Sequence, residues 1–136
     1  MLKFGEIVLR SKKPRELADF LSFIFDSQIS SDVDENDNDL FRLDVLGKEF
    51  VVKEGKPGAN PVASFSLLST EPSDIDELKQ KVEFFYYKNS SKHKAPLLEE
   101  DYLFFFDPDN RLWRVKSPSV SVTHLVDKIH QDVRHF

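Results

Sequence analysis

The sequence predicts an α+β fold made of two similar modules, each with a strand, a helix and two or three further strands. The order strand, helix, strands begins near residue 6 and begins again near residue 63. Apolar residues recur with helical spacing in the predicted helices, and Leu103 to Phe106 are aromatic and aliphatic, as a buried strand requires. Residues 101–118 also read as a hairpin with Pro108 in its turn. Repetition of one supersecondary unit favours an internally duplicated domain.

Module one covers about residues 1–56 and opens with a strand predicted at residues 4–10. Side chains alternate along this strand, so Glu6 and Arg10 share one of its faces. Pro14 suits the first turn of a helix, and we expect the helix at residues 15–26. Its apolar stripe consists of Leu17, Phe20, Leu21, Ile24 and Phe25.

The rest of module one is predicted to be strands joined by polar turns. Residues 29–33 form a short strand, and residues 32–39 form an acidic loop. Residues 40–45 and 50–52 then form a hairpin that turns at Gly47. Residues 54–61 contain two glycines and two prolines, which is typical of a linker.

Module two covers about residues 61–118 and repeats this order. A strand is predicted at residues 63–68. Ser73 with Asp76 three residues later resembles a helix-capping signal. The apolar face of the helix that follows consists of Ile75, Leu78, Val82 and Phe85. A short strand at residues 97–98 leads into the last hairpin.

A helical extension is predicted at residues 119–136. Its apolar stripe consists of Val122, Leu125, Val126, Ile129 and Val133. An apolar stripe of this kind gains free energy when it is covered, at about 25 cal/mol per Å² of apolar surface. We therefore expect the extension to pack on its own sheet or on a partner, and we expect the protein to be a homodimer.

Composition excludes several classes of function. A chain of 136 residues corresponds to about one domain, and its net charge of −5 does not suggest a nucleic-acid partner. The absence of cysteine excludes disulfides, thiol nucleophiles and thiolate metal sites. The longest apolar runs are too short to span a bilayer, and the N-terminal residues do not resemble a signal peptide. We expect no membrane partner and a cytoplasmic location.

Two charged segments resemble binding motifs but are better explained as solvated loops. Residues 32–39 place Asp32, Asp34 and Asn36 like the first ligands of an EF-hand loop. Asp37 replaces the required glycine, however, and Leu43 stands where the final Glu belongs. Residues 88–94 form a small basic loop without interleaved aromatic residues, so nucleic-acid binding is not expected there.

The last hairpin resembles the corresponding hairpin of the vicinal-oxygen-chelate superfamily, the glyoxalase/bleomycin-resistance/dioxygenase group. That hairpin reads as an apolar strand, the turn DPDGN and a strand carrying a Glu metal ligand, and the sequence here is DYLFFFDPDNRLWRV. Phe20-Leu21 and Phe25-Asp26 stand where the family has Phe-Tyr and Leu-Gly. The resemblance implies two βαβββ modules that form a half-open mixed β-barrel with a central cleft, over residues 1–118.

The resemblance also implies positions for metal ligands. In metal-using members the first strand of a module supplies His or Gln, and its last strand supplies Glu. In module one these positions fall on Glu6 and near Val51, with Glu49 two residues before on the same face. In module two they fall near Ser64 and on Trp113, whose indole is only a donor. We therefore expect no metal cofactor, with Glu6 and Glu49 as weak candidates for a divalent ion.

The function that this resemblance implies is metal-free binding of a small molecule. The candidate cleft residues are Glu6, Arg10, Ser64, Ser66 and Trp113, together with Phe104 or Phe106. Trp113 fits either an aromatic wall of the cleft or a core position, and Glu6 fits either a metal ligand or general base or a carboxylate paired with Arg10.

Two other functions remain open. One is a metal-dependent lyase, isomerase or dioxygenase that uses Glu6 and Glu49. If the protein is an enzyme, it belongs to this lyase or oxidoreductase class. The other is a non-catalytic interaction protein with a filled cleft.

Overall fold

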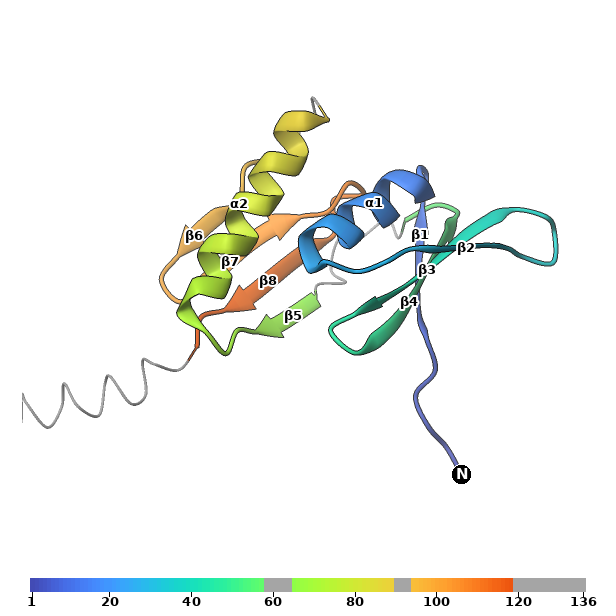
Figure 1. The fold of residues 1–136 in the computed structure, drawn as a ribbon, viewed down its shortest axis with the longest axis horizontal. Helices are drawn as coiled ribbons and strands as arrows, with labels where there is room; N and C mark the ends of the chain where they lie inside the picture. The colour runs from blue at the N-terminus through green and yellow to red at the C-terminus, as the bar shows by residue number, and fades with distance from the viewer. Residues whose placement is uncertain (58–64, 90–93, 119–136) are drawn as a thin grey trace, which may run out of the picture.

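The fold is α+β, with two four-stranded mixed sheets and two helices (Figure 1). The computed structural model describes residues 1–57, 65–89 and 94–118. The elements of module one are β1 (Ile7–Ser11), α1 (Pro14–Phe25), β2 (Ser30–Val33), β3 (Asp39–Val45) and β4 (Lys48–Glu54). Those of module two are β5 (Phe65–Leu68), α2 (Pro72–Lys88), β6 (Leu97–Glu99), β7 (Tyr102–Phe106) and β8 (Leu112–Lys116).

The two sheets have the same topology. Sheet one has the strand order β1-β4-β3-β2, and sheet two has the order β5-β8-β7-β6. In each sheet the first strand of the module runs parallel to its last strand, and the other neighbours are antiparallel. This correspondence confirms the duplicated fold class. The strands of the described residues do not close into a barrel.

One aromatic core joins the two modules. Helix α1 lies between the two sheets, and α2 lies across sheet two (Figure 1). The ring of Phe20 on α1 lies 5.1 Å from that of Phe85 on α2 and 6.1 Å from that of Phe105 on β7. Helix α1 therefore contributes its predicted apolar stripe to both modules.

Alternation along the strands gives each sheet an inner face, packed on the helices, and an outer face. In sheet one the inner face carries Leu9, Leu43 and Phe50, all buried in the core. In sheet two the inner face carries Leu103, Phe105, Trp113 and Val115. The outer face of each sheet consists of the intervening residues.

The end of α1 and the start of α2 differ in detail from the prediction. Helix α1 ends without glycine because Asp26 itself adopts the left-handed conformation, with φ of 52°. Helix α2 begins at Pro72, before the predicted Ser73. The backbone N–H of Glu71 donates to the Asp74 carboxylate at 3.2 Å, so the capping interaction lies two residues earlier than expected.

The remaining boundaries follow the prediction closely. The ladder between β1 and β4 starts with Ile7 opposite Phe50, so Glu6 lies immediately before β1. The β3–β4 turn has positive φ at Leu46 and Gly47, as a two-residue hairpin turn requires. The predicted C-terminal helix at residues 119–136 lies outside the described residues. No described helix is long and apolar enough to cross a membrane.

Candidate functional site

The outer face of sheet one is organised around Arg42 on β3. Its Nη1 donates to Glu49 Oε1 at 2.9 Å and to Glu6 Oε2 at 3.4 Å. Its Nε lies 3.8 Å from Asp32 Oδ2. These carboxylates raise the pKa of Arg42, and the largest cause is the hydrogen bond that Arg42 donates to Glu49. The two predicted metal candidates, Glu6 and Glu49, are thus brought together, but around a guanidinium.

The expected partner of Glu6 was Arg10, and the structure shows a different one. Glu6 pairs with Arg42 on β3. Only β4 lies between β1 and β3, and Arg42 is opposite Val51 of β4, so its long side chain can reach Glu6. Arg10 lies on the same outer face and is exposed. Its aliphatic stem packs at Gly55, where an added Cβ would lie 3.0 Å from Arg10 Cδ.

The outer face of sheet two combines a cation with aromatic rings. Arg114 on β8 pairs with Ser66 on β5 and with Phe104 on β7. Its Nε donates to Ser66 Oγ at 2.7 Å, and its guanidinium lies 5.6 Å from the centroid of the Tyr102 ring. Tyr102 and Phe104 are stacked with their centroids 5.7 Å apart. Phe104 and Phe106 both belong to this outer face, whereas Phe105 lies in the core.

Of the two positions predicted for Trp113, a wall of the cleft or the core, the structure shows the core position. It is 0% exposed, and it lies on the inner face of sheet two. Its ring lies 4.2 Å from that of Phe65, 5.6 Å from that of Phe25 and 6.0 Å from that of Phe105. The structure therefore separates Trp113 from the other candidates, which lie on the outer faces. Ser64 lies outside the described residues.

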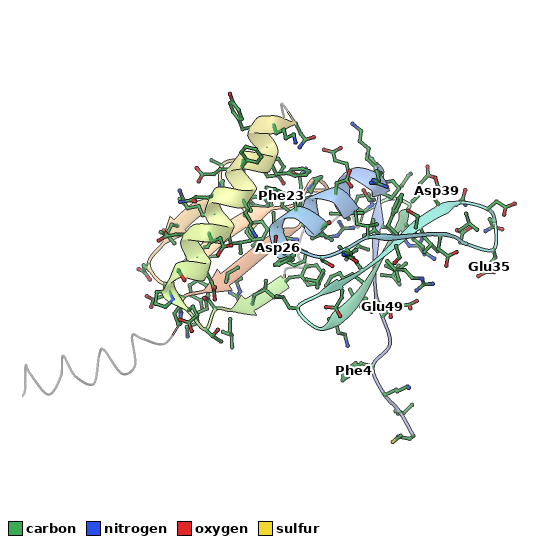
Figure 2. All side chains as sticks on the ribbon, in the orientation of Figure 1. Phe4, Phe23, Asp26, Glu35, Asp39 and Glu49 are labelled. Atoms are coloured by element: carbon green, nitrogen blue, oxygen red, sulfur yellow. The ribbon has the colours of Figure 1, made fainter. Side chains whose placement is uncertain are left out.

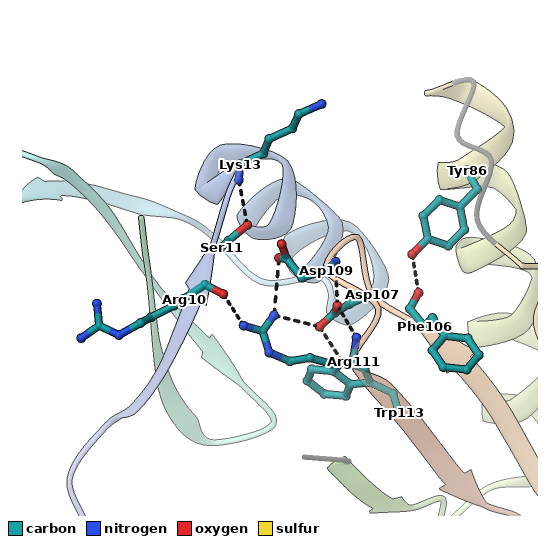
Figure 3. A network of polar contacts seen from close by, with 9 residues as sticks. All are labelled: Arg10, Ser11, Lys13, Tyr86, Phe106, Asp107, Asp109, Arg111 and Trp113. Carbon is teal, nitrogen blue, oxygen red and sulfur yellow. Dashed lines mark hydrogen bonds and ion pairs between the residues drawn. The ribbon is translucent and has the colours of Figure 1, made fainter. Parts of the chain in front are cut away.

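A buried carboxylate, Asp107, organises the β7–β8 turn (Figure 3). Its Oδ1 accepts hydrogen bonds from the backbone N–H of Asp109 at 2.9 Å and of Arg111 at 3.0 Å. Its Oδ2 accepts from Trp113 Nε1 at 3.1 Å and from Arg111 Nη1 at 3.4 Å. Burial raises the pKa of the Asp107 carboxyl, and these hydrogen bonds oppose that rise.

Arg111 connects this turn to module one. Its Nη2 donates to the backbone carbonyl of Arg10 at the end of β1, and its Nη1 also lies 3.4 Å from Asp109 Oδ2 (Figure 3). Tyr86 on α2 donates its hydroxyl to the backbone carbonyl of Phe106, and burial raises the pKa of that hydroxyl. These contacts hold the turn between α2 and β1 and fix the direction of β8.

The same turn shows which residue of β8 faces outward. Asn110 has φ of 65°, the left-handed conformation that glycine adopts most easily. Asn110 therefore takes the place of the glycine in DPDG, and the assignment of the following residues to the family pattern moves by one from the one expected from the sequence. The position of the family's Glu then falls on Arg114 rather than on Trp113. The strand pairing supports this assignment. In module two Ser66 of the first strand lies opposite Arg114 of the last strand, as in module one Val8 lies opposite Val51.

A groove of about 250 Å³ lies elsewhere, between the end of α1, the end of β5 and α2. None of the predicted site residues lines it. Lys81, Asp26 and Glu77 at its edge form ion pairs, and Asp74 accepts hydrogen bonds at the start of α2. Lys81 Nζ lies 2.6 Å from Asp26 Oδ2 and 3.5 Å from Glu77 Oε1, and the hydrogen bond to Asp26 raises the Lys81 pKa. We therefore do not assign the candidate site to this groove.

The acidic segment predicted at residues 32–39 spans the β2–β3 hairpin tip. Asp34 Oδ1 accepts from the backbone N–H groups of Asn36 at 2.8 Å and Asn38 at 2.9 Å, which lowers the Asp34 pKa. Figure 2 shows Glu35 and Asp39 at this tip, well away from Glu49. Among the described residues, no three His, Asp or Glu side chains are placed to hold one metal ion.

Solved structures share this architecture at low sequence identity. A variant of the fosfomycin resistance protein FosX from Listeria monocytogenes, complexed with Mn(II) and a dihydroxypropylphosphonic acid, matches with a TM-score of 0.67 and 16% identity, over 87% of this chain and 93% of that chain. FosX from Mesorhizobium loti matches with a TM-score of 0.64 and 10% identity, over 92% and 98% of the two chains.

A third neighbour belongs to the group that the last hairpin resembles. A glyoxylase/bleomycin resistance protein/dioxygenase domain from Frankia sp. matches with a TM-score of 0.61 and 13% identity, over 87% of this chain and 98% of that chain. This chain has the vicinal-oxygen-chelate fold. No family model and no curated protein matches the sequence, so the assignment rests on the fold.

The two candidate metal ligands and the paired outer positions of module two do not fit a metal ion. In module one the carboxylates of Glu6 and Glu49 are bound by Arg42. In module two the paired outer positions hold Ser66 and Arg114. A guanidinium carries a fixed positive charge and has no acceptor atom, so it repels a divalent cation and cannot ligate it.

The residues that sequence reasoning missed are Arg42, Arg114 and Tyr102. Arg114 was detectable, because Trp113 and Val115 alternate with it and complete the apolar inner face of sheet two. Arg42 was not detectable, since only the strand order places it between Glu49 and Asp32.

Proposed function

We propose that this protein binds a small molecule without a metal ion, through the outer faces of its sheets. The observation that carries the proposal is the position of the two guanidinium groups. Arg114 stands at a ligand position of module two, and Arg42 occupies the space between the carboxylates of module one. The FosX variant and the Frankia domain support the fold on which such a site is built.

Metal analysis gives the first test. We expect protein purified without added metal to contain no near-stoichiometric zinc, iron, manganese or nickel. The reason is that Glu6 and Glu49 would have to leave Arg42 before they could bind a cation. Elemental analysis of the full chain measures this directly. Near-stoichiometric metal would contradict the proposal and favour the metal-dependent lyase, isomerase or dioxygenase.

Ligand screening by NMR tests where small molecules bind. A panel of neutral, anionic and cationic aromatic compounds should shift the backbone resonances around Ser66, Tyr102 and Arg114, with or without a chelator. Shifts confined to the groove near Lys81 and Asp26 would place the site elsewhere. A panel that shifts no resonance on either outer face would contradict small-molecule binding there.

We also propose a homodimer in which a second copy covers an outer face. The support is the exposure of apolar residues there: Leu68 is 79% exposed, Leu97 is 55% exposed and Val8 is 43% exposed. Leu68 and Leu97 lie on the two edge strands of sheet two and Val8 lies on an edge strand of sheet one, and exposed apolar groups of this kind are typical of an interaction surface. Covering that face would also turn an open sheet into an enclosed ligand site.

Light scattering at micromolar concentration tests the dimer. We expect a mass twice that of the 15.8 kDa chain. The pair Leu68→Ser and Leu97→Ser should shift the protein toward the monomer, because both changes remove exposed apolar area from the proposed interface. A matched pair of controls on the helices, Phe23→Ser and Phe84→Ser, removes exposed rings that stack on each other away from the sheets. A monomeric wild-type protein would reject the dimer.

A further inference from the structure

We propose that the outer face of sheet two selects planar aromatic carboxylates, with Arg114 as the group that binds the carboxylate. This inference rests on the function proposed above and specifies its ligand. It follows from three properties of the face: a guanidinium held in place, a positive charge without a counter-charge, and a half-buried aromatic surface beside it.

The Arg114 guanidinium is held from two directions. Its Nε donates to Ser66 Oγ at 2.7 Å, so one edge of the planar group is occupied. Its centre lies 5.6 Å from the centroid of the Tyr102 ring, within the range of a cation–π interaction. Both contacts come from neighbouring strands of the same sheet, β5 and β7. The guanidinium therefore loses little freedom when an anion binds.

The charge of Arg114 is not neutralised by the described residues. No described carboxylate lies within ion-pair distance of it, whereas Arg42 has three such partners, Glu6, Glu49 and Asp32. With Nε bonded to Ser66, the two terminal nitrogens of Arg114 remain to donate. Two parallel N–H groups match the two oxygens of one carboxylate. Lys116, in the next outward position of β8, adds further positive charge.

An aromatic platform adjoins this anion-binding group. The rings of Tyr102 and Phe104 stack 5.7 Å apart along β7, and Phe104 pairs directly with Arg114. Exposed Leu97 on β6 pairs directly with Phe104 and extends this apolar surface. A planar apolar ring can cover this platform while its carboxylate reaches Arg114. A ligand with both features would use the charge and the apolar surface together.

The test compares 2-naphthoate with its neutral amide, 2-naphthamide, on the full chain by isothermal titration calorimetry. We expect 2-naphthoate to bind at least about tenfold more tightly, as a charge-assisted bidentate pair allows. Arg114→Gln should weaken 2-naphthoate by about tenfold and leave 2-naphthamide unchanged. Arg114→Lys should restore part of the affinity, because ammonium keeps the charge but not the planar fork. Arg15→Gln, which removes an exposed cation from α1, is the matched control and should bind like wild type.

Equal affinity for 2-naphthoate and 2-naphthamide in the unmodified protein, with resonance shifts on this face, would overturn the carboxylate inference and leave the proposed function standing. Binding of only the cationic aromatic compounds to the outer faces would overturn the carboxylate inference in the same way. If no compound of any charge binds to an outer face, both proposals fail. Because the comparison of the two ligands uses unmodified protein, it decides the inference even if Arg114→Gln does not fold.

Discussion

Replacing Trp113 with Ala should lower the free energy of unfolding by about 3–5 kcal/mol, the usual cost of removing a large buried aromatic side chain. Trp113 is 0% exposed, and its ring packs against Phe25 of module one as well as Phe65 and Phe105 of module two. The change would leave a cavity where the two modules meet. Urea denaturation followed by far-ultraviolet circular dichroism measures the loss, since the variant has no tryptophan to report by fluorescence.

The variant Trp113→Phe separates packing from hydrogen bonding. It keeps an aromatic ring but removes the indole N–H that donates to Asp107. We expect it to cost less than the Ala variant and to bind small molecules like wild type, because Trp113 faces the core. A Trp113→Ala protein as stable as wild type would show that the ring is not part of the core. Lost ligand binding in a stable Trp113→Phe protein would restore the cleft-wall interpretation.

The fold was predictable because its signals are local and repeated. The stripe on α1 reflects a helical periodicity, the unbroken apolar run of β7 marks a strand, and the duplication makes the two modules corroborate each other. The start of α2 was missed because Glu71 and Asp74 make an unusual capping pair, and Ser73 offered a more familiar signal. Pro72, which suits the first helical position, indicated the correct start.

The candidate site was less predictable, because it depends on register and on which strands become neighbours. One residue of shift in the β7–β8 turn exchanges Trp113 for Arg114 and moves the assignment from the core to the outer face. The shift arises because Asn110 adopts the conformation usually reserved for glycine. The Arg42 cluster depends on contacts between β1, β3 and β4, which no local pattern encodes.

Replacing Asp107 with Asn should lower the free energy of unfolding by about 3 kcal/mol, since it breaks a buried ionic hydrogen-bond network while preserving side-chain shape. Both carboxylate oxygens act only as acceptors, and each accepts two hydrogen bonds. An amide supplies one oxygen, and its NH₂ group would face two donors wherever it is placed. Arg111, which also reaches the Arg10 carbonyl, would lose its buried counter-charge.

Asp101→Asn is the matched control for this change, because Asp101 is an exposed carboxylate just before β7 and its side chain makes no ion pair with the described residues. It should unfold like wild type in urea. The indole N–H resonance of Trp113 gives a second measurement that is specific to the network, since Trp113 is the only tryptophan. That resonance should shift in Asp107→Asn and stay in place in Asp101→Asn. If Asp107→Asn is as stable as Asp101→Asn and the resonance does not move, then Asp107 does not hold the β7–β8 turn, and the direction of β8, with Arg114 outward, must have another cause.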